Sequence, residues 1–235
     1  MKLHNATVLI TGANRGIGLA FAREALARGA RKVYAAVRDP DSVTLRGVEA
    51  VQLDVTKPED VAAAARRLGD VTVLINNAGI GKTGGFLAEG SIEAARAQLE
   101  TNYFGPLQMS LAFAPVLAAN GGGAILNVLS IASWISSPTL AVYGSTKAAA
   151  WSLTNGLRHE LRAQGTQVLG MHMGFVDTDL TRDIDAAKST PEAVVREALD
   201  ALERGAEEVL ADDITRQVKE GLSAELPVYL QVLER

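Results

Sequence analysis

The sequence predicts an α/β protein in which a doubly wound parallel sheet of about seven strands carries helices on both faces. Short apolar runs alternate with longer stretches of helical periodicity, an order typical of a parallel sheet. Ala, Val, Leu, Ile and Gly dominate a composition that is 48% hydrophobic. The 235 residues fit a single domain spanning 1–235, because α/β domains often reach this length and no linker or repeat divides the chain.

Charge and composition narrow the classes of function. The net charge is −4, with acidic and basic residues mixed, so no basic stripe marks a nucleic-acid partner. Cysteine is absent, which excludes disulfides and thiol chemistry and favours a reducing compartment. The N-terminal residues lack the apolar length of a signal peptide, and no apolar run approaches about 18 residues. We expect a cytoplasmic protein without a membrane partner.

The first strand, at residues 7–10, leads into a glycine-rich turn and a helix at 19–28. The strand is apolar and β-branched, and Gly12, Gly16 and Gly18 crowd the turn. Such a turn lets the backbone approach a phosphate, and a helix N-terminus adds free N–H groups and a positive dipole end. The spacing G-x-x-x-G-x-G differs from the standard dinucleotide fingerprint. The flanking elements nevertheless favour a phosphate site over a turn without function.

The second strand, at 32–37, is followed by residues that bear on the type of dinucleotide. An acid near this point binds the ribose hydroxyls of NAD, whereas arginine suits the 2′-phosphate of NADP. Arg38 follows the strand and Arg15 lies in the glycine turn, which favours NADP. Asp39, next in the sequence, could instead be the acid that binds NAD, displaced by a residue or two. If the site has no such function, the two arginines are simply solvated.

The third and fourth strands, at 48–53 and 71–75, flank a helix at 58–68 that begins with proline. The fourth strand runs into Asn76-Asn77-Ala78-Gly79, small and amide residues at the edge where an open α/β sheet binds its ligand. The following Gly81-Lys82-Thr83 is not a phosphate loop, because the glycine required five residues earlier is an asparagine. Lys82 is therefore expected to be a solvated loop residue.

Two helices at 91–100 and 103–119 precede the fifth strand, at 124–129. Their junction contains Asn102, and Pro106 and Pro115 are expected to bend the second helix or mark its start. Ser130 ends the fifth strand and so lies at the same edge of the sheet as the glycine turn.

A helix containing Tyr143 and running to about residue 163 follows. Tyr143 and Lys147 are spaced i and i+4 and share one helical face. A phenol beside an ammonium is a usable acid or base, and we expect the ammonium to lower the Tyr143 pKa below about 10. Taken alone, this pair also fits two surface residues.

The sixth and seventh strands are expected at 166–173 and 208–211, with a helix from Pro191 between them. Thr178 follows the sixth strand, and residues 178–190 form a short candidate lid over an open, permissive site. His172 is expected to pack within the strand, and Asp212-Asp213 to form a polar turn. His4 and His159 are expected to be solvated, and no grouping has metal-ligand spacing, so no metal is expected.

These motifs together resemble the short-chain dehydrogenase/reductase family, whose fold is of the Rossmann type, over nearly the whole chain. The resemblance rests on the segment 11–18, Asp54, the segment 76–79, Asn102, Ser130, and Tyr143-x-x-x-Lys147 thirteen residues after the serine. One departure is Met173-Gly174 in place of the family's Pro-Gly. The resemblance therefore does not define the course of the backbone at this point.

The resemblance implies four catalytic residues for an NADP(H)-dependent oxidoreductase that interconverts a carbonyl and an alcohol. Tyr143 is the acid or base, Ser130 holds the substrate oxygen, Lys147 binds the ribose and lowers the Tyr143 pKa, and Asn102 holds a relay water. NADP is preferred, with NAD possible. The implied cofactor-binding residues are Gly12, Asn14, Arg15, Gly16, Ile17, Gly18, Arg38, Asp54, Val55, Asn77, Ala78, Gly79, Tyr143, Lys147, Gly174, Val176 and Thr178.

The resemblance also implies a homodimer or homotetramer packed through the Asn102 and Tyr143 helices, and a small carbonyl or alcohol substrate. Expected pocket walls are Trp134, Ile135, Leu140, Phe175 and Val176, with core or surface packing as the alternative for each. One alternative function is a non-catalytic NADP-binding sensor or regulator. Another is an isomerase or dehydratase that works through transient oxidation. For the C-terminal tail, 226–235, three alternatives stay open: it docks on a neighbouring subunit, it covers the site, or it frays.

Overall fold

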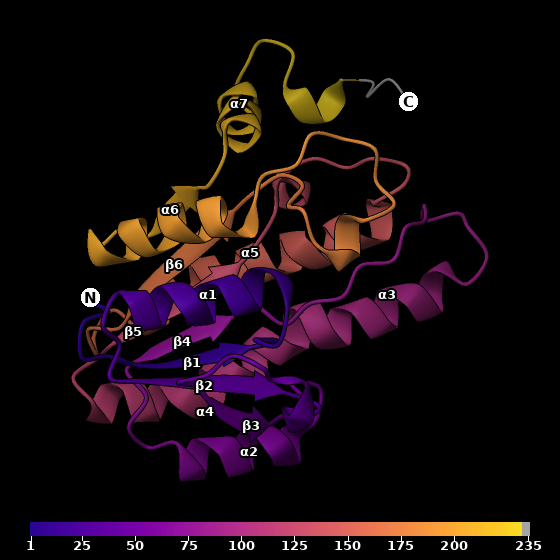
Figure 1. The fold of residues 1–235 in the computed structure, drawn as a ribbon. Helices are drawn as coiled ribbons and strands as arrows, with labels where there is room; N and C mark the ends of the chain where they lie inside the picture. The colour runs from indigo at the N-terminus through magenta and orange to yellow at the C-terminus, as the bar shows by residue number, and fades with distance from the viewer. Residues whose placement is uncertain (232–235) are drawn as a thin grey trace.

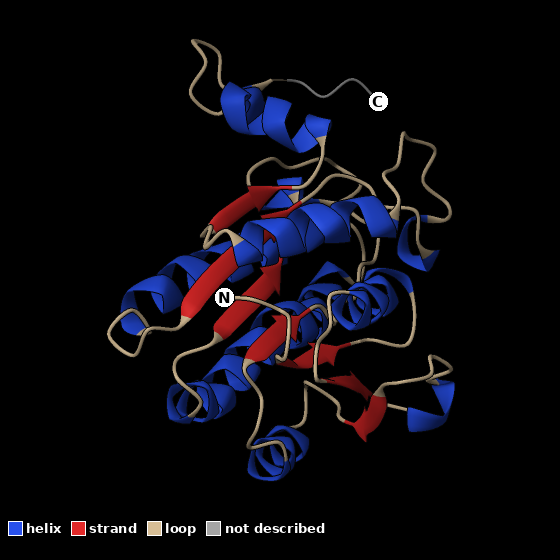
Figure 2. Ribbon diagram, turned by 60° about the vertical axis from the view of Figure 1, so that its left-hand side comes forward, coloured by secondary structure: helices blue, strands red, loops and turns tan. Residues whose placement is uncertain are grey.

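A computed structural model describes residues 1–231 and shows one seven-stranded, fully parallel sheet between two layers of helices (Figures 1 and 2). The strand order is β3-β2-β1-β4-β5-β6-β7. The chain adds strands outward on one side from β1 to β3 and on the other side from β4 to β7, so the order reverses between β1 and β4. This is the doubly wound topology predicted from the alternation of strands and helices. An open sheet of this kind binds its ligand at the carboxyl edge where the order reverses.

The strands are short, and the five inner strands are almost fully buried because helices cover both faces, whereas the edge strands β3 and β7 are partly exposed. They span β1 Thr7–Thr11, β2 Lys32–Val37, β3 Glu49–Gln52, β4 Val73–Asn76, β5 Ala124–Val128, β6 Gln167–His172 and β7 Glu208–Leu210. Every predicted strand is present, and no strand end differs from the prediction by more than two residues. Valine, isoleucine and leucine fill the sheet because each strand is packed on both sides.

Two apolar clusters, one on each face of the sheet, make up the core. Helices α1 and α6 pack together on one face, and α2, α4 and α5 cover the other (Figure 1). The helices span α1 Gly16–Ala27, α2 Pro58–Arg67, α3 Ser91–Leu99, α4 Gly105–Ala119, α5 Ala141–Glu160, α6 Pro191–Glu203 and α7 Asp213–Gly221. None of the helices among residues 1–231 has both the length and the apolar character needed to cross a membrane.

Two features differ from the sequence prediction. Helices α3 and α4 form one continuous path through a π-helical turn at Glu100–Phe104, which puts Asn102 at a bulge; Pro106 marks the start of α4 and Pro115 lies inside it. Asp212-Asp213 is not a polar turn: the Asp212 side chain accepts the Thr215 N–H and caps α7, a helix missing from the prediction. The tail is described only to residue 231, and residues 232–235 lie outside the described chain.

Candidate active site and cofactor-binding edge

The glycine turn places an uncapped helix N-terminus at the carboxyl edge of the sheet. Gly12 and Gly16 have φ of 67° and 53°, left-handed values that favour glycine. Helix α1 begins without a side-chain cap and without an acidic residue in its first turn. Its first N–H groups and its dipole are therefore available to an anion. Gly18 is required for packing, since a Cβ there would lie 2.1 Å from the Gly12 oxygen.

Thr11 ties the glycine turn to the segment after β4, at the point where the strand order reverses. Its hydroxyl accepts the N–H groups of Asn77 and Ala78, both at 3.0 Å. The Asn77 amide donates to the Thr11 carbonyl at 2.9 Å and to the Gly12 carbonyl at 3.2 Å. The structure thus brings Gly12, Asn77 and Ala78 together as predicted. The prediction did not assign Thr11 a role, although a hydroxyl ending the first strand was a usable signal.

The two predicted phosphate-binding arginines have different surroundings. Arg15 donates to Asp179 of the lid segment at 2.7 Å, an ion pair that the sequence did not predict. Arg38 is exposed near Asp54, at the end of the second strand. Burial acts to raise the Asp54 pKa, but hydrogen bonds from Thr56 and the charge of Arg38 lower it overall.

Asp39, the alternative acid for NAD, is occupied as a helix cap. Its carboxylate accepts the Asp41 N–H at 3.2 Å. The segment it caps is also joined to the glycine turn, since the Asn14 amide donates to the Ser42 hydroxyl at 3.2 Å. Asn14 therefore links the loop that follows β1 to the loop that follows β2.

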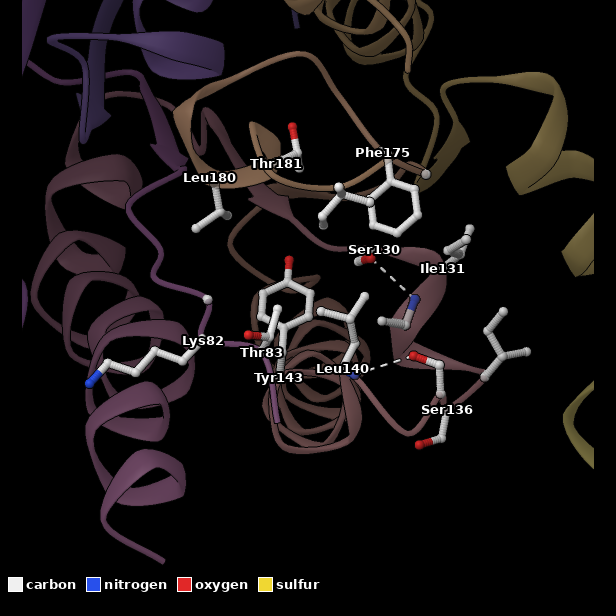
Figure 3. A pocket seen from close by; sticks show the side chains of 16 residues that line it. Lys82, Thr83, Ser130, Ile131, Ser136, Leu140, Tyr143, Phe175, Leu180 and Thr181 are labelled. Carbon is white, nitrogen blue, oxygen red and sulfur yellow. Dashed lines mark hydrogen bonds between the residues drawn. The ribbon is translucent and has the colours of Figure 1, made fainter. Parts of the chain in front are cut away.

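Ser130, Tyr143 and Lys147 lie together, as their spacing predicted. Ser130 follows β5, and its hydroxyl accepts the Ala132 N–H at 3.1 Å (Figure 3). The Lys147 ammonium lies 5.7 Å from the centre of the Tyr143 ring and donates to the Val128 carbonyl at 2.9 Å. Lys147 is only 6% exposed. A buried ammonium thus sits beneath a phenol that opens onto a cavity.

The expected lowering of the Tyr143 pKa is wrong for this structure. Burial raises the pKa of Tyr143 to about 12, and the Ser130 hydroxyl only partly opposes that effect. Burial also lowers the pKa of Lys147 to about 8. Removing either group from water disfavours its charged form, which raises the pKa of a phenol and lowers that of an ammonium. With its pKa raised in this way, the Tyr143 phenol is protonated at neutral pH.

Asn102 joins three segments around Lys147. Its side-chain oxygen accepts the Ile80 N–H at 2.9 Å, and its amide donates to the Ile80 carbonyl at 2.8 Å and to the Thr146 hydroxyl at 2.9 Å. Gly79 lies beside both groups, since a Cβ there would lie 3.4 Å from the Asn102 side-chain oxygen and 3.9 Å from the Lys147 nitrogen. The π-helical bulge makes these contacts possible by turning Asn102 inward.

The segment after β6 forms the opposite side of the edge. Thr178 contacts the glycine turn, since a Cβ on Gly16 would lie 3.3 Å from its methyl group. Gly174 donates its N–H to Asp212 at 2.8 Å, which holds the backbone path that the sequence left open. Val176 is a buried core residue, and its carbonyl accepts the Thr178 and Thr181 hydroxyls. Gly174 and Thr181 line the cavity described next, whereas Val176 and Thr178 do not.

A cavity of about 220 Å³ lies between Tyr143, Ser130 and the lid segment (Figure 3). Ile135, Leu140 and Phe175 line it as predicted. Trp134 and Val176 do not, which corrects the prediction for both: Val176 packs in the core, and Trp134 stacks on His172. Walls that the sequence did not identify are Gly81, Lys82, Thr83, Ile131, Ala132, Ser136, Ser137, Leu180, Thr181 and Ile184.

The remaining predicted side chains behave as expected. Lys82, His4 and His159 are exposed, and His172 is fully buried within β6. Among the residues that the structure describes, no group of three or more His, Cys, Asp or Glu side chains is arranged to hold a metal ion.

Comparisons with known proteins agree with this geometry. The model of the short chain dehydrogenase family matches residues 6–189. An uncharacterized oxidoreductase from Staphylococcus saprophyticus is 30% identical over 87% of this chain and 94% of its own. A Burkholderia cenocepacia short-chain dehydrogenase solved with NADP has a TM-score of 0.94 and 39% identity, covering 99% of this chain and 100% of that one. A Burkholderia phymatum structure solved with NAD, 24% identical with a TM-score of 0.87, covers 100% of both chains and shares the fold.

Proposed function

The chain belongs to the short-chain dehydrogenase/reductase family, and from this premise we propose that it is an NADP(H)-dependent oxidoreductase. In one domain, it reduces a ketone or aldehyde to an alcohol, or runs the reverse reaction, with Tyr143 as acid or base. The observation that carries this proposal is the placement of the Ser130 hydroxyl and the Tyr143 phenol at one cavity, above a buried Lys147.

The glycine-turn edge fits a dinucleotide. The uncapped N-terminus of α1 suits a pyrophosphate, and Gly12, Gly16 and Gly18 leave it open to close approach. Arg15 and Arg38 are the groups that would hold the 2′-phosphate of NADP. The NADP named in the Burkholderia cenocepacia relative supports the same preference. When bound, the nicotinamide supplies or accepts the hydride.

Ser130 holds the substrate oxygen. Because its oxygen already accepts the Ala132 N–H, its own proton is directed to another acceptor, and the carbonyl oxygen of a substrate in the cavity fits that need. This hydrogen bond orients the carbonyl for hydride transfer and polarises it.

Tyr143 delivers the proton that reduction requires. With its pKa raised to about 12, the phenol stays protonated at neutral pH and donates to the oxygen that gains negative charge. In the oxidative direction the same group must lose its proton, and a positive charge placed beside it lowers that cost. Two properties therefore support this role for Tyr143: the place of its phenol at the cavity and the pKa that keeps it protonated.

Lys147 and Asn102 return the proton to Tyr143. Burial brings the Lys147 pKa to about 8, close to neutrality, so the ammonium exchanges a proton readily. Asn102 positions the loop above Lys147 through Ile80, and a water held there would complete the path to solvent. Lys147 is also the group that would bind the nicotinamide ribose.

We also propose a homodimer or homotetramer that packs through α4 and α5. Large apolar side chains are exposed along α3 and α4: Ile92 is 65%, Phe104 40% and Leu111 75% exposed. Exposed apolar residues clustered along one helical path are typical of an interface between subunits.

The test is the loss of absorbance at about 340 nm by NADPH mixed with a panel of ketones, aldehydes and quinones. We expect turnover of at least one carbonyl class, and slower turnover with NADH. NADPH binding without turnover of any carbonyl would instead support a non-catalytic NADP-binding sensor or regulator. Cofactor that copurifies tightly and is not consumed would support an isomerase or dehydratase.

A further inference from the structure

Resting on the proposed function, we propose that the substrate is an uncharged carbonyl compound with a compact apolar body, and that anionic carbonyl compounds are excluded. The cavity walls are largely aliphatic or aromatic. They include Ile131, Ile135, Leu140, Phe175, Leu180 and Ile184. Displacing water from an apolar wall is favourable when apolar surface replaces it, and the body of the substrate supplies that surface.

Among the residues that the structure describes, none presents a positive charge to a carboxylate in the cavity. Among its lining residues in the described chain, Lys82 is the only charged one, and its side chain extends away from the cavity (Figure 3). The other polar side chains are the hydroxyls of Tyr143 and of serine and threonine residues. An unpaired anion placed there would lose its hydration, at a cost of several kcal/mol. The polar groups needed for one carbonyl oxygen, in contrast, are present.

The volume limits the size of the substrate. At about 220 Å³, the cavity is smaller than the roughly 300–1,000 Å³ that encloses a drug-sized ligand. Leu180, Thr181 and Ile184 of the lid segment form one of its walls. A single-ring aldehyde is therefore a suitable probe.

The experiment compares methyl 4-formylbenzoate with 4-formylbenzoate, two aldehydes with the same frame that differ in charge. With NADPH, we expect kcat/KM for the ester to exceed that for the acid by at least about 100-fold, since each 1.4 kcal/mol is a factor of ten. Leu180→Arg, which adds a cation to the wall, should improve the acid about tenfold relative to the ester. Leu87→Arg is the matched control, because Leu87 is fully exposed and does not line the cavity.

Equal turnover of ester and acid, or a preference for the acid, would overturn the inference while leaving the proposed function intact. Turnover of neither aldehyde, nor of the wider panel, would count against the proposed function. The same pair is then compared by calorimetric binding to the NADP⁺-saturated protein. Tighter binding of the ester supports the apolar site, and tighter or equal binding of the acid contradicts it.

A separate observation concerns His172, a fully buried imidazole behind Ser130. Its Nδ1 lies 3.1 Å from the Ser130 carbonyl, and its ring stacks on Trp134 at 3.9 Å and 22°. A carbonyl can only accept, so Nδ1 carries the proton. Nε2 has no hydrogen-bond partner among residues 1–231 and lies 3.8 Å from a Glu208 carboxylate oxygen. Burial lowers the pKa of His172 to about 3, with Lys219, Arg158 and Lys147 adding to the effect.

We infer that His172 is a positioning residue, which fixes Ser130 through its backbone and the cavity wall through Trp134. Trp134 ends the short helix Ile131–Ser133 and precedes Ile135, and both flanking segments line the cavity. The stacking of Trp134 on His172 thus fixes the loop that follows Ser130, while the hydrogen bond from His172 fixes the backbone of Ser130 itself.

Two substitutions separate these contacts. His172→Phe keeps the ring and removes the donor, so kcat should fall at least about tenfold while NADPH affinity stays within about twofold. His172→Asn keeps a donor near Nδ1 and removes the stacking, so KM for the ester should rise with kcat nearly retained. Leu199→Ala, a change at a buried position within α6, is the control for lost stability alone.

Kinetic changes in both His172 variants that match those of Leu199→Ala at equal loss of thermal stability would contradict the inference. So would wild-type kinetics in both. If neither variant folds, Trp134→Leu tests the stacking contact by itself, and an unchanged KM there overturns that part of the inference.

Discussion

Replacing Lys147 with methionine should stabilise the fold at neutral pH while removing activity. Lys147 is buried, and burial shifts its pKa from 10.5 to about 8. At about 1.4 kcal/mol per pKa unit, keeping the charge inside costs roughly 3 kcal/mol at pH 7. Methionine removes this cost but leaves the Val128 carbonyl without its hydrogen bond, a loss of about 1–2 kcal/mol. The free energy of unfolding should therefore rise by about 1–2 kcal/mol.

The difference between the two proteins depends on pH in a defined direction. Between pH 8 and 10.5 the unfolded lysine binds more protons than the folded one, so wild-type stability rises with pH across this window. The variant lacks this gain. It should be the more stable protein below about pH 8, and the less stable one above about pH 10.5, where only the lost hydrogen bond remains.

Urea unfolding followed by tryptophan fluorescence, at pH 7 and at pH 10.5, measures both quantities. Lys2→Met, at an exposed position, is the matched control and should change stability little at either pH. Turnover of Lys147→Met should fall at least about 100-fold, with weaker NADPH binding. A Lys147→Met protein that is less stable than wild type at pH 7, or whose stability difference does not change with pH, would refute the reasoning.

Two further substitutions test the remaining roles. Tyr143→Phe should reduce turnover by about 100- to 10,000-fold and leave NADPH affinity within about twofold, measured by fluorescence titration; retained turnover would remove Tyr143 from the mechanism. Arg15→Ala combined with Arg38→Ala should weaken NADPH binding about tenfold or more but NADH binding little, because only NADPH carries the 2′-phosphate. An equal loss for both nucleotides would contradict the phosphate assignment, and Arg46→Ala, at another exposed arginine, serves as the control.

Much of the site follows from local pattern. An apolar run followed by glycines, amides or a serine places each of these residues at a strand's carboxyl end, and parallel strands put such ends at one edge. The helical spacing of Tyr143 and Lys147 puts both on one face. These relations need only the periodicity of strands and helices, which is why Gly12, Asn77, Ser130 and Tyr143 lie where the sequence predicted.

Other features depend on which distant segments pack together, and only the tertiary structure decided them. The direction of the Tyr143 pKa shift is set by how much water the surrounding loops remove, not by its spacing from Lys147. The Arg15–Asp179 ion pair joins residues 164 positions apart. Trp134 stacks on His172 instead of lining the cavity, a contact between residues that are far apart in the sequence. Sequence alone determined the fold, the family and the edge that holds the chemistry, whereas desolvation and long-range contacts determined the acidity and shape of the site.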